Sequence, residues 1–406
     1  MSLAESEGRI ARVEFTGTRS ELFGLLTRGY LLMVPTIGIY RFWVTTAKRR
    51  FYWQHTVIDG EPLEYSGTPL QLLIGFLFAV AFFLPMYIAF FYLSTQAPQI
   101  ALVGYAVVVA LIWFFMGYAI YRARDFRLSR TLWRGIRFNQ YGSAWVYAIR
   151  RFFWSLAMLA TLGLIYPFMA ANLWRYRYNN TWYGDRQFRW TGNWKTIAGP
   201  YYALYALLVL GLVGVGVVIA SEAGSISRYA GPGNGTVLSL IGWFVLAFLA
   251  SFYFRSREAT RMFSEVWVGE ARATVKVRAR ALFGQFILYL LALIGAGLVL
   301  GLIGAMVAPM FAGELADGGS GSVAADIARI AQSSWINIAL LIFAYLALIA
   351  VFALMGEVFL GYGYWMLVAR GAAITNADSL RTVRAAGEDR ALAGEGLADA
   401  LNVGAY

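Results

Sequence analysis

Long apolar runs constrain this chain more strongly than any other feature of its sequence. Residues 71–93 read QLLIGFLFAVAFFLPMYIAFFYL and carry no charge, and several other runs are similar. At 1.5 Å per residue, about 20 apolar residues suffice to cross roughly 30 Å of hydrocarbon. The sequence therefore predicts an all-α polytopic membrane protein, with full transmembrane helices at roughly 69–95, 99–121, 198–220, 236–256, 282–308 and 337–368.

The charged residues are few, and they alternate between loops. Only 14% of residues are charged, against about 25% in a typical soluble domain. Cations crowd the loops at 48–50, 122–137, 175–195 and 255–280, whereas the loops at 94–99, 221–234 and 309–336 hold almost none. Because cytoplasmic loops carry the excess of Lys and Arg, we expect the basic loops and both termini in the cytoplasm.

Two further apolar segments, 22–44 and 150–174, do not fit this alternation. Each lies between two basic segments, so a single crossing would export one of them. Each also has helix-breaking residues near its centre, Pro35 with Gly38 and Gly163 with Pro167. We therefore predict two re-entrant or interfacial helical hairpins that enter and leave on the cytoplasmic side. The alternative is eight plain spans.

The chain also repeats itself. VEFTGT at 13–18 matches LEYSGT at 63–68, and 137–142 and 187–192 are weaker copies. Apolar residues alternate in these segments, which indicates short strands or extended, β-like cytoplasmic turns between repeats. The expected organisation is a cytoplasmic tail (1–12), a repeated transmembrane domain (13–370) with units starting near 13, 63, 137, 187 and 273, and a partly disordered cytoplasmic tail (371–406).

The segment LFGLLTRGYLLMVPTIGIYRFWVTTAKRRFYWQHTVIDGEPLEYSGTPLQLLIGFLFA resembles the YjgN-like family of bacterial inner-membrane proteins, a domain of unknown function. The resemblance is strongest over 13–80 and continues through TLWRGIRF and NNTWYGDRQFRWTG. It implies a bacterial inner membrane and no catalytic residues.

Residues that could carry chemistry are scarce. The chain has no cysteine and a single histidine, His55, and we find no nucleophile or paired acids within an apolar segment. We therefore expect no enzyme, no metal and no cofactor. Glu357 is the acid that lies deepest in an apolar run, and such acids often face a cavity or a partner. It is our candidate intramembrane functional residue, and it favours a transporter or channel for a small molecule or ion.

Arginine and aromatic residues interleave in LWRYRYNNTWYGDRQFRWTGNW (173–194). Such a surface suits anionic headgroups at the cytoplasmic side of the membrane. A non-transporting scaffold or anionic-lipid-binding protein is thus the alternative function, with membrane lipids as partners and no nucleic acid. The candidate lipid or anion contacts are Arg175, Arg177, Arg186 and Arg189.

Overall fold

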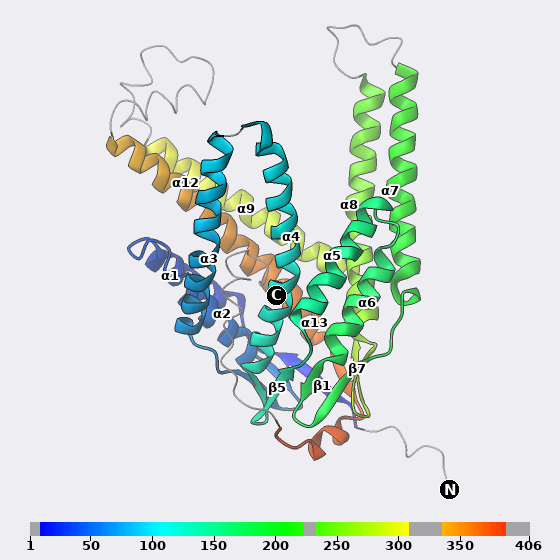
Figure 1. Ribbon diagram of the computed structural model, residues 1–406. Helices are drawn as coiled ribbons and strands as arrows, with labels where there is room; N and C mark the ends of the chain where they lie inside the picture. The colour runs from blue at the N-terminus through cyan, green and yellow to red at the C-terminus, as the bar shows by residue number, and fades with distance from the viewer. Residues whose placement is uncertain (1–8, 97, 223–232, 308–334, 387–406) are drawn as a thin grey trace, which may run out of the picture.

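A closed antiparallel β-barrel of ten strands forms the base of the molecule, and helices rise from one end of it (Figure 1). The computed structural model describes residues 9–96, 98–222, 233–307 and 335–386. Around the barrel the strands follow the order β1-β10-β9-β8-β7-β6-β5-β4-β3-β2. Their bounds are β1 Ala11–Phe15, β2 Thr56–Ile58, β3 Glu61–Tyr65, β4 Thr131–Trp133, β5 Ile136–Gln140, β6 Thr181–Tyr183, β7 Arg186–Trp190, β8 Val266–Val268, β9 Ala271–Val275 and β10 Ala372–Thr375.

The helices come in pairs that leave and return to the barrel. Each pair follows one strand and leads into the next, so the chain winds once around the barrel as it moves up and down. Their bounds are α1 Arg19–Met33, α2 Arg41–Gln54, α3 Pro69–Gln96, α4 Pro98–Ser129, α5 Ala144–Ala160, α6 Tyr166–Asn179, α7 Lys195–Glu222, α8 Asn234–Phe263, α9 Ala279–Val307, α12 Trp335–Met355, the π-helix η2 Gly356–Gly361, α13 Tyr362–Arg370 and the 3-10 helix η3 Ala377–Thr382.

The barrel overturns the prediction of an all-α fold. Its strands are three to five residues long, too short for periodicity alone to distinguish them from extended turns. What makes them a sheet is pairing between distant segments, as when Phe15 pairs with Thr56 and Ala372 with Val275. The sequence indicated short extended segments, but it did not show that they close into one ring.

Tight turns and inward apolar residues stabilise the four hairpins of the barrel. The first turn, Asp59–Gly60, has positive φ at both positions (54° and 83°), as two-residue type I′ hairpin loops require. Alternate residues along the strands face inward and pack together. This barrel core is built from Ile58, Leu63, Trp133, Ile136, Phe138, Tyr183, Phe188, Val268, Ala271 and Ile374.

Residues after β10 cover the end of the barrel that faces away from the helices (Figure 1). Leu380 and Val383 are buried against the barrel core. Asp185, in the turn between β6 and β7, accepts from the Arg384 amide at 3.1 Å and donates its own amide to the Arg384 carbonyl at 3.1 Å. Burial raises the pKa of Tyr183, which faces the same core, to about 12. Residues 371–406 were expected to be a tail, but this segment begins with strand β10 and with η3, which covers the end of the barrel.

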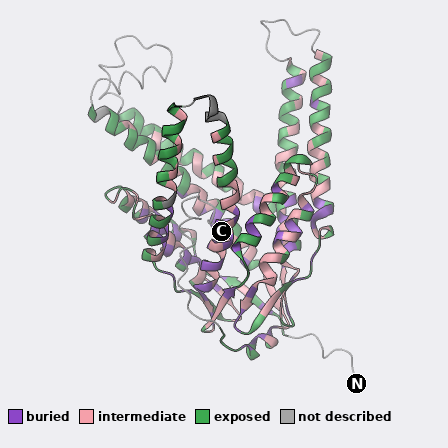
Figure 2. Ribbon diagram, in the orientation of Figure 1, coloured by how far each residue is buried: buried purple, intermediate pink, exposed green. Residues whose placement is uncertain are grey.

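In the part of the chain that the structure describes, six helical segments are long and apolar enough to cross a membrane, and they agree with the six expected spans. They are Pro69–Gln96, Val103–Ser129, Lys195–Glu222, Asn234–Phe263, Ala279–Met306 and Ile338–Arg370. Buried residues concentrate at the barrel and at the adjoining halves of the helices, whereas the far halves are largely exposed (Figure 2). No residue of the most apolar stretch of α9 is buried. The long helices therefore present apolar surface that requires lipid or a partner.

The two segments that broke the charge alternation each form two shorter helices. In both the chain turns through a pair of residues with positive φ, Ile37–Gly38 between α1 and α2, and Leu162–Gly163 between α5 and α6. The turns are apolar and open: Ile37 is 93% exposed and Leu162 is 84% exposed. Neither segment is one continuous helix.

Candidate functional site at the junction of helices and barrel

Buried threonines mark the level at which helices meet the barrel. Thr56, Thr131 and Thr181 are the first residues of β2, β4 and β6. Each hydroxyl donates to the carbonyl four residues earlier, at 2.7–2.8 Å, which joins the helix end to the strand. Each also accepts from a side chain of another helix. The donors are Trp365 Nε1 (3.0 Å), Trp53 Nε1 (2.8 Å) and Arg124 Nη1 (2.8 Å).

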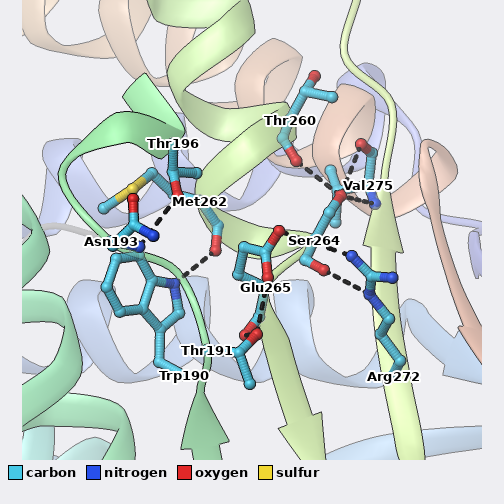
Figure 3. A network of polar contacts seen from close by, with 10 residues as sticks. All are labelled: Trp190, Thr191, Asn193, Thr196, Thr260, Met262, Ser264, Glu265, Arg272 and Val275. Atoms are coloured by element: carbon cyan, nitrogen blue, oxygen red, sulfur yellow. Dashed lines mark hydrogen bonds and ion pairs between the residues drawn. The ribbon is translucent and has the colours of Figure 1, made fainter. Parts of the chain in front are cut away.

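The β7–β9 side of this level is held by other contacts, among them those of Trp190, Ser264 and Arg272 (Figure 3). Its strand β8 begins with Val266, which has no hydroxyl. Trp190 Nε1 donates to the Met262 carbonyl at 3.0 Å, and Arg272 Nε donates to the Ser264 carbonyl at 2.9 Å. A Cβ on Gly192 would lie 2.4 Å from the Trp190 ring, so glycine is needed where this indole folds back. These contacts fix α8 on the rim of the barrel.

Glu357 lies in the π-helix η2, where its charge is paired. Lys48 Nζ lies 3.0 Å from Glu357 Oε2, and the Tyr52 hydroxyl donates to Oε1 at 3.1 Å. The side chains of Glu357 and Lys48 are only 11% and 18% exposed. The candidate acid therefore joins η2 to α2, 309 residues away in sequence.

Sequence reasoning missed a second acid, Glu258. It was counted within the basic loop 255–280, but α8 continues to Phe263 and carries Glu258 into contact with α6. There the Tyr166 hydroxyl donates to Glu258 Oε1. Burial, and then the charge of Glu258, raise the pKa of Tyr166, so this tyrosine remains a donor. The one signal in the sequence was a helical pattern that continues past the apolar run 236–256 and so places Glu258 on the same helix.

The four candidate arginines do not form one patch. Arg175 donates to the Gly192 carbonyl at 2.9 Å, and Arg177 stacks on Trp174 at 5.3 Å. Arg186 and Arg189 are exposed, but an odd spacing along β7 places them on opposite faces of the strand. Arg177 instead approaches Arg124 of α4, a neighbour that its sequence position does not reveal.

A groove of about 580 Å³ runs between α1 and α2. Its walls are mostly apolar, and the exposed Arg28 lies in it without an ion pair or hydrogen bond to any described residue. The lining residues are Ser20, Glu21, Gly24, Leu25, Arg28, Gly29, Leu32, Tyr40, Trp43, Val44 and Ala47.

These features define the architecture: within the described ranges, six helices that are long and apolar enough to span a bilayer stand on a small closed barrel. Within the described ranges no group of three or more His, Asp or Glu side chains could hold a metal ion. The chain belongs to a family described as "Bacterial protein of unknown function (DUF898)", whose model matches residues 10–399. This is the family that the YjgN-like resemblance indicated. Comparisons with curated proteins and with solved structures found no match.

Proposed function

We propose that this protein lies in the bacterial inner membrane with its barrel in the cytoplasm, and that it binds anionic phospholipid. Charge placement supports the orientation. No charged residue occurs in α3, and the first cation of α8 is Arg255, near the end that reaches the barrel. Cations thus gather at the barrel end, which by the positive-inside rule is cytoplasmic. β1 and η3, the first and last described elements, both lie at this end, which supports cytoplasmic termini.

The groove between α1 and α2 is the observation that carries the lipid proposal. Leu25, Leu32 and Trp43 offer apolar contact for an acyl chain, and Arg28 offers a cation for the phosphate. The exposed apolar turn at Ile37 continues the same surface. A helical hairpin with such a tip suits shallow insertion into the cytoplasmic leaflet, which would bring headgroups to the level of Arg28.

Lipid retained through purification tests this proposal. Wild type and Arg28→Gln are purified in one detergent, and phosphatidylglycerol per protein is measured by mass spectrometry. Arg28→Gln is expected to lower this ratio because the phosphate loses its cation. Arg381→Gln is the matched control, since it removes an exposed positive charge on η3, at the end of the barrel that faces away from the helices, and it should retain the wild-type ratio. An unchanged ratio in Arg28→Gln would refute the proposal.

Transport of a small molecule or ion is the second candidate, and η2 is the observation that favours it. π-Helical turns within α-helices occur frequently at functional sites, and this one carries Glu357. A proton-coupled carrier would need that carboxylate to release Lys48 during its cycle. Proton flux into proteoliposomes, measured with an enclosed pH dye, tests this. Transport is supported if wild type shows proton flux, Glu357→Gln loses it and the control Glu14→Gln keeps it. Equal flux in all three contradicts it.

We also infer that the helix pairs and hairpins derive from one repeated unit. Arg50 donates to the Gly67 carbonyl at 3.1 Å, and Arg175 donates to the Gly192 carbonyl at 2.9 Å. The two residues of each pair are 17 positions apart. The same contact at the same separation in two units supports common descent of the units.

A further inference from the structure

Two arginines from different helix pairs meet at the barrel rim. Arg124 lies near the end of α4 and Arg177 near the end of α6, and these helices flank α5 (Figure 1). Arg124 Nη1 donates to Thr181 Oγ1 at 2.8 Å and to the Gln140 side chain, and it lies 3.5 Å from the Arg177 carbonyl. The positive charge of Arg177 acts directly on that of Arg124.

No described carboxylate neutralises this pair. Arg124 makes no ion pair with a described acid, and its polar partners are Thr181, Gln140 and the Arg177 carbonyl. The acid next to it, Asp125, binds Arg122 at 3.1 Å instead. Arg177 makes no ion pair with a described residue, and its Nε is buried without a hydrogen-bond partner. Because enclosed charges are normally paired, two adjacent arginines without an acid constitute a site with excess positive charge.

Aromatic rings hold the two guanidinium groups. The Tyr178 ring lies 5.0 Å from Arg124, and the Trp174 ring lies 5.3 Å from Arg177. These two rings stack on each other at 5.1 Å, so they form one platform. Each ring covers a guanidinium face. Arg124 Nη1 already donates within the protein and Arg177 Nε is buried, so the remaining N–H groups of the two arginines are the ones left for a ligand. Both residues are half-buried and not fully enclosed.

We propose that Arg124 and Arg177 form a binding site for a phosphate-type oxyanion. Guanidinium edges match phosphate oxygens in bidentate geometry, and two of them supply the charge that the protein leaves uncompensated. The phosphate belongs either to a lipid headgroup or to a free phosphate ion. This site is on α4 and α6, not in the groove between α1 and α2, so it does not depend on the proposed lipid function.

Ligand-induced stabilisation of the full-length protein tests the site. All variants carry Arg28→Gln, so that the α1–α2 groove does not contribute. Unfolding midpoints in detergent are measured against inorganic phosphate, with chloride at equal ionic strength as reference. In a second series they are measured against phosphatidylglycerol, with phosphatidylcholine as reference. A ligand that binds only the folded protein raises the midpoint as its concentration rises.

The midpoint is expected to rise with at least one probe in the Arg28→Gln parent. A rise with inorganic phosphate identifies a soluble oxyanion, and a rise with phosphatidylglycerol alone identifies a headgroup. Arg177→Gln should weaken the apparent affinity by at least about tenfold, since it removes charge-assisted hydrogen bonds. Arg177→Lys retains the charge but lacks the planar guanidinium, so its apparent affinity should lie between those of the parent and Arg177→Gln. Arg381→Gln, an equal charge change on η3 at the far end of the barrel, should behave as the parent. No rise with either probe, or an Arg177→Gln response equal to the parent, overturns the site.

Discussion

Replacing either member of the Lys48–Glu357 pair is expected to destabilise the protein strongly. Unit charges 3.0 Å apart attract by about 5.5 kcal/mol at an effective dielectric constant of about 20. The side chains keep 18% and 11% exposure, so residual water offsets part of this attraction. We therefore expect Lys48→Met or Glu357→Gln alone to cost about 3 kcal/mol, near the lower limit for breaking a buried pair.

The double variant separates an ion pair from two independent contributions. Lys48→Met with Glu357→Gln leaves no uncompensated charge, and Tyr52 can still donate to the Gln oxygen. The double variant should therefore lose about 1 kcal/mol, far less than the sum of the single losses.

Thermal unfolding in detergent measures these differences, and the midpoint is expected to fall by roughly 3–4 °C in each single variant. The exposed pair Arg381–Asp378, at 3.7 Å, is the control, and Arg381→Gln should shift the midpoint very little. Single variants with the wild-type unfolding midpoint would refute this reasoning. So would a loss in the double variant equal to the sum of the two single losses.

Three further changes test other parts of the fold. Gly192→Ala should destabilise by roughly 1–3 kcal/mol, because its Cβ would meet an indole ring 2.4 Å away, whereas Gly214→Ala, with open space around it, should not destabilise in the same thermal assay. A backbone hydrogen bond from Thr18 lowers the pKa of Glu21, so the stability this carboxylate provides exists above the unfolded-state pKa and is lost as pH falls through the folded-state value. The midpoint difference between wild type and Glu21→Gln should therefore shrink between neutral and acid pH; a constant difference would contradict the helix cap. Leu380→Asp places a charge at a buried position of η3 and should speed limited proteolysis of the C-terminal segment. Equal cleavage rates in the variant and wild type would argue against the packing of Leu380 on the barrel core.

Much of the membrane part could be predicted from local sequence. A helix crosses a bilayer because a run of side chains is long and apolar, and that property needs no partner, so the six spans were recognisable. The turns at Pro35–Gly38 and Gly163–Pro167 were visible for the same reason, because glycine and proline limit a helix wherever it packs. The alternating residues of VEFTGT and LEYSGT likewise indicated extended backbone.

The barrel and the sites depended on contacts between distant residues. A strand of three to five residues has no stability by itself and exists here because its neighbours pair with it on both edges. Glu357 is paired with Lys48, 309 residues away, and the Arg177 carbonyl lies 3.5 Å from Arg124 Nη1, on another helix pair. Run length, charge placement and turn chemistry are local, so the sequence alone determined the spans and the basic end of the protein. Strand closure and charge pairing are decided by which segments meet in space, and only the tertiary structure brings those segments together.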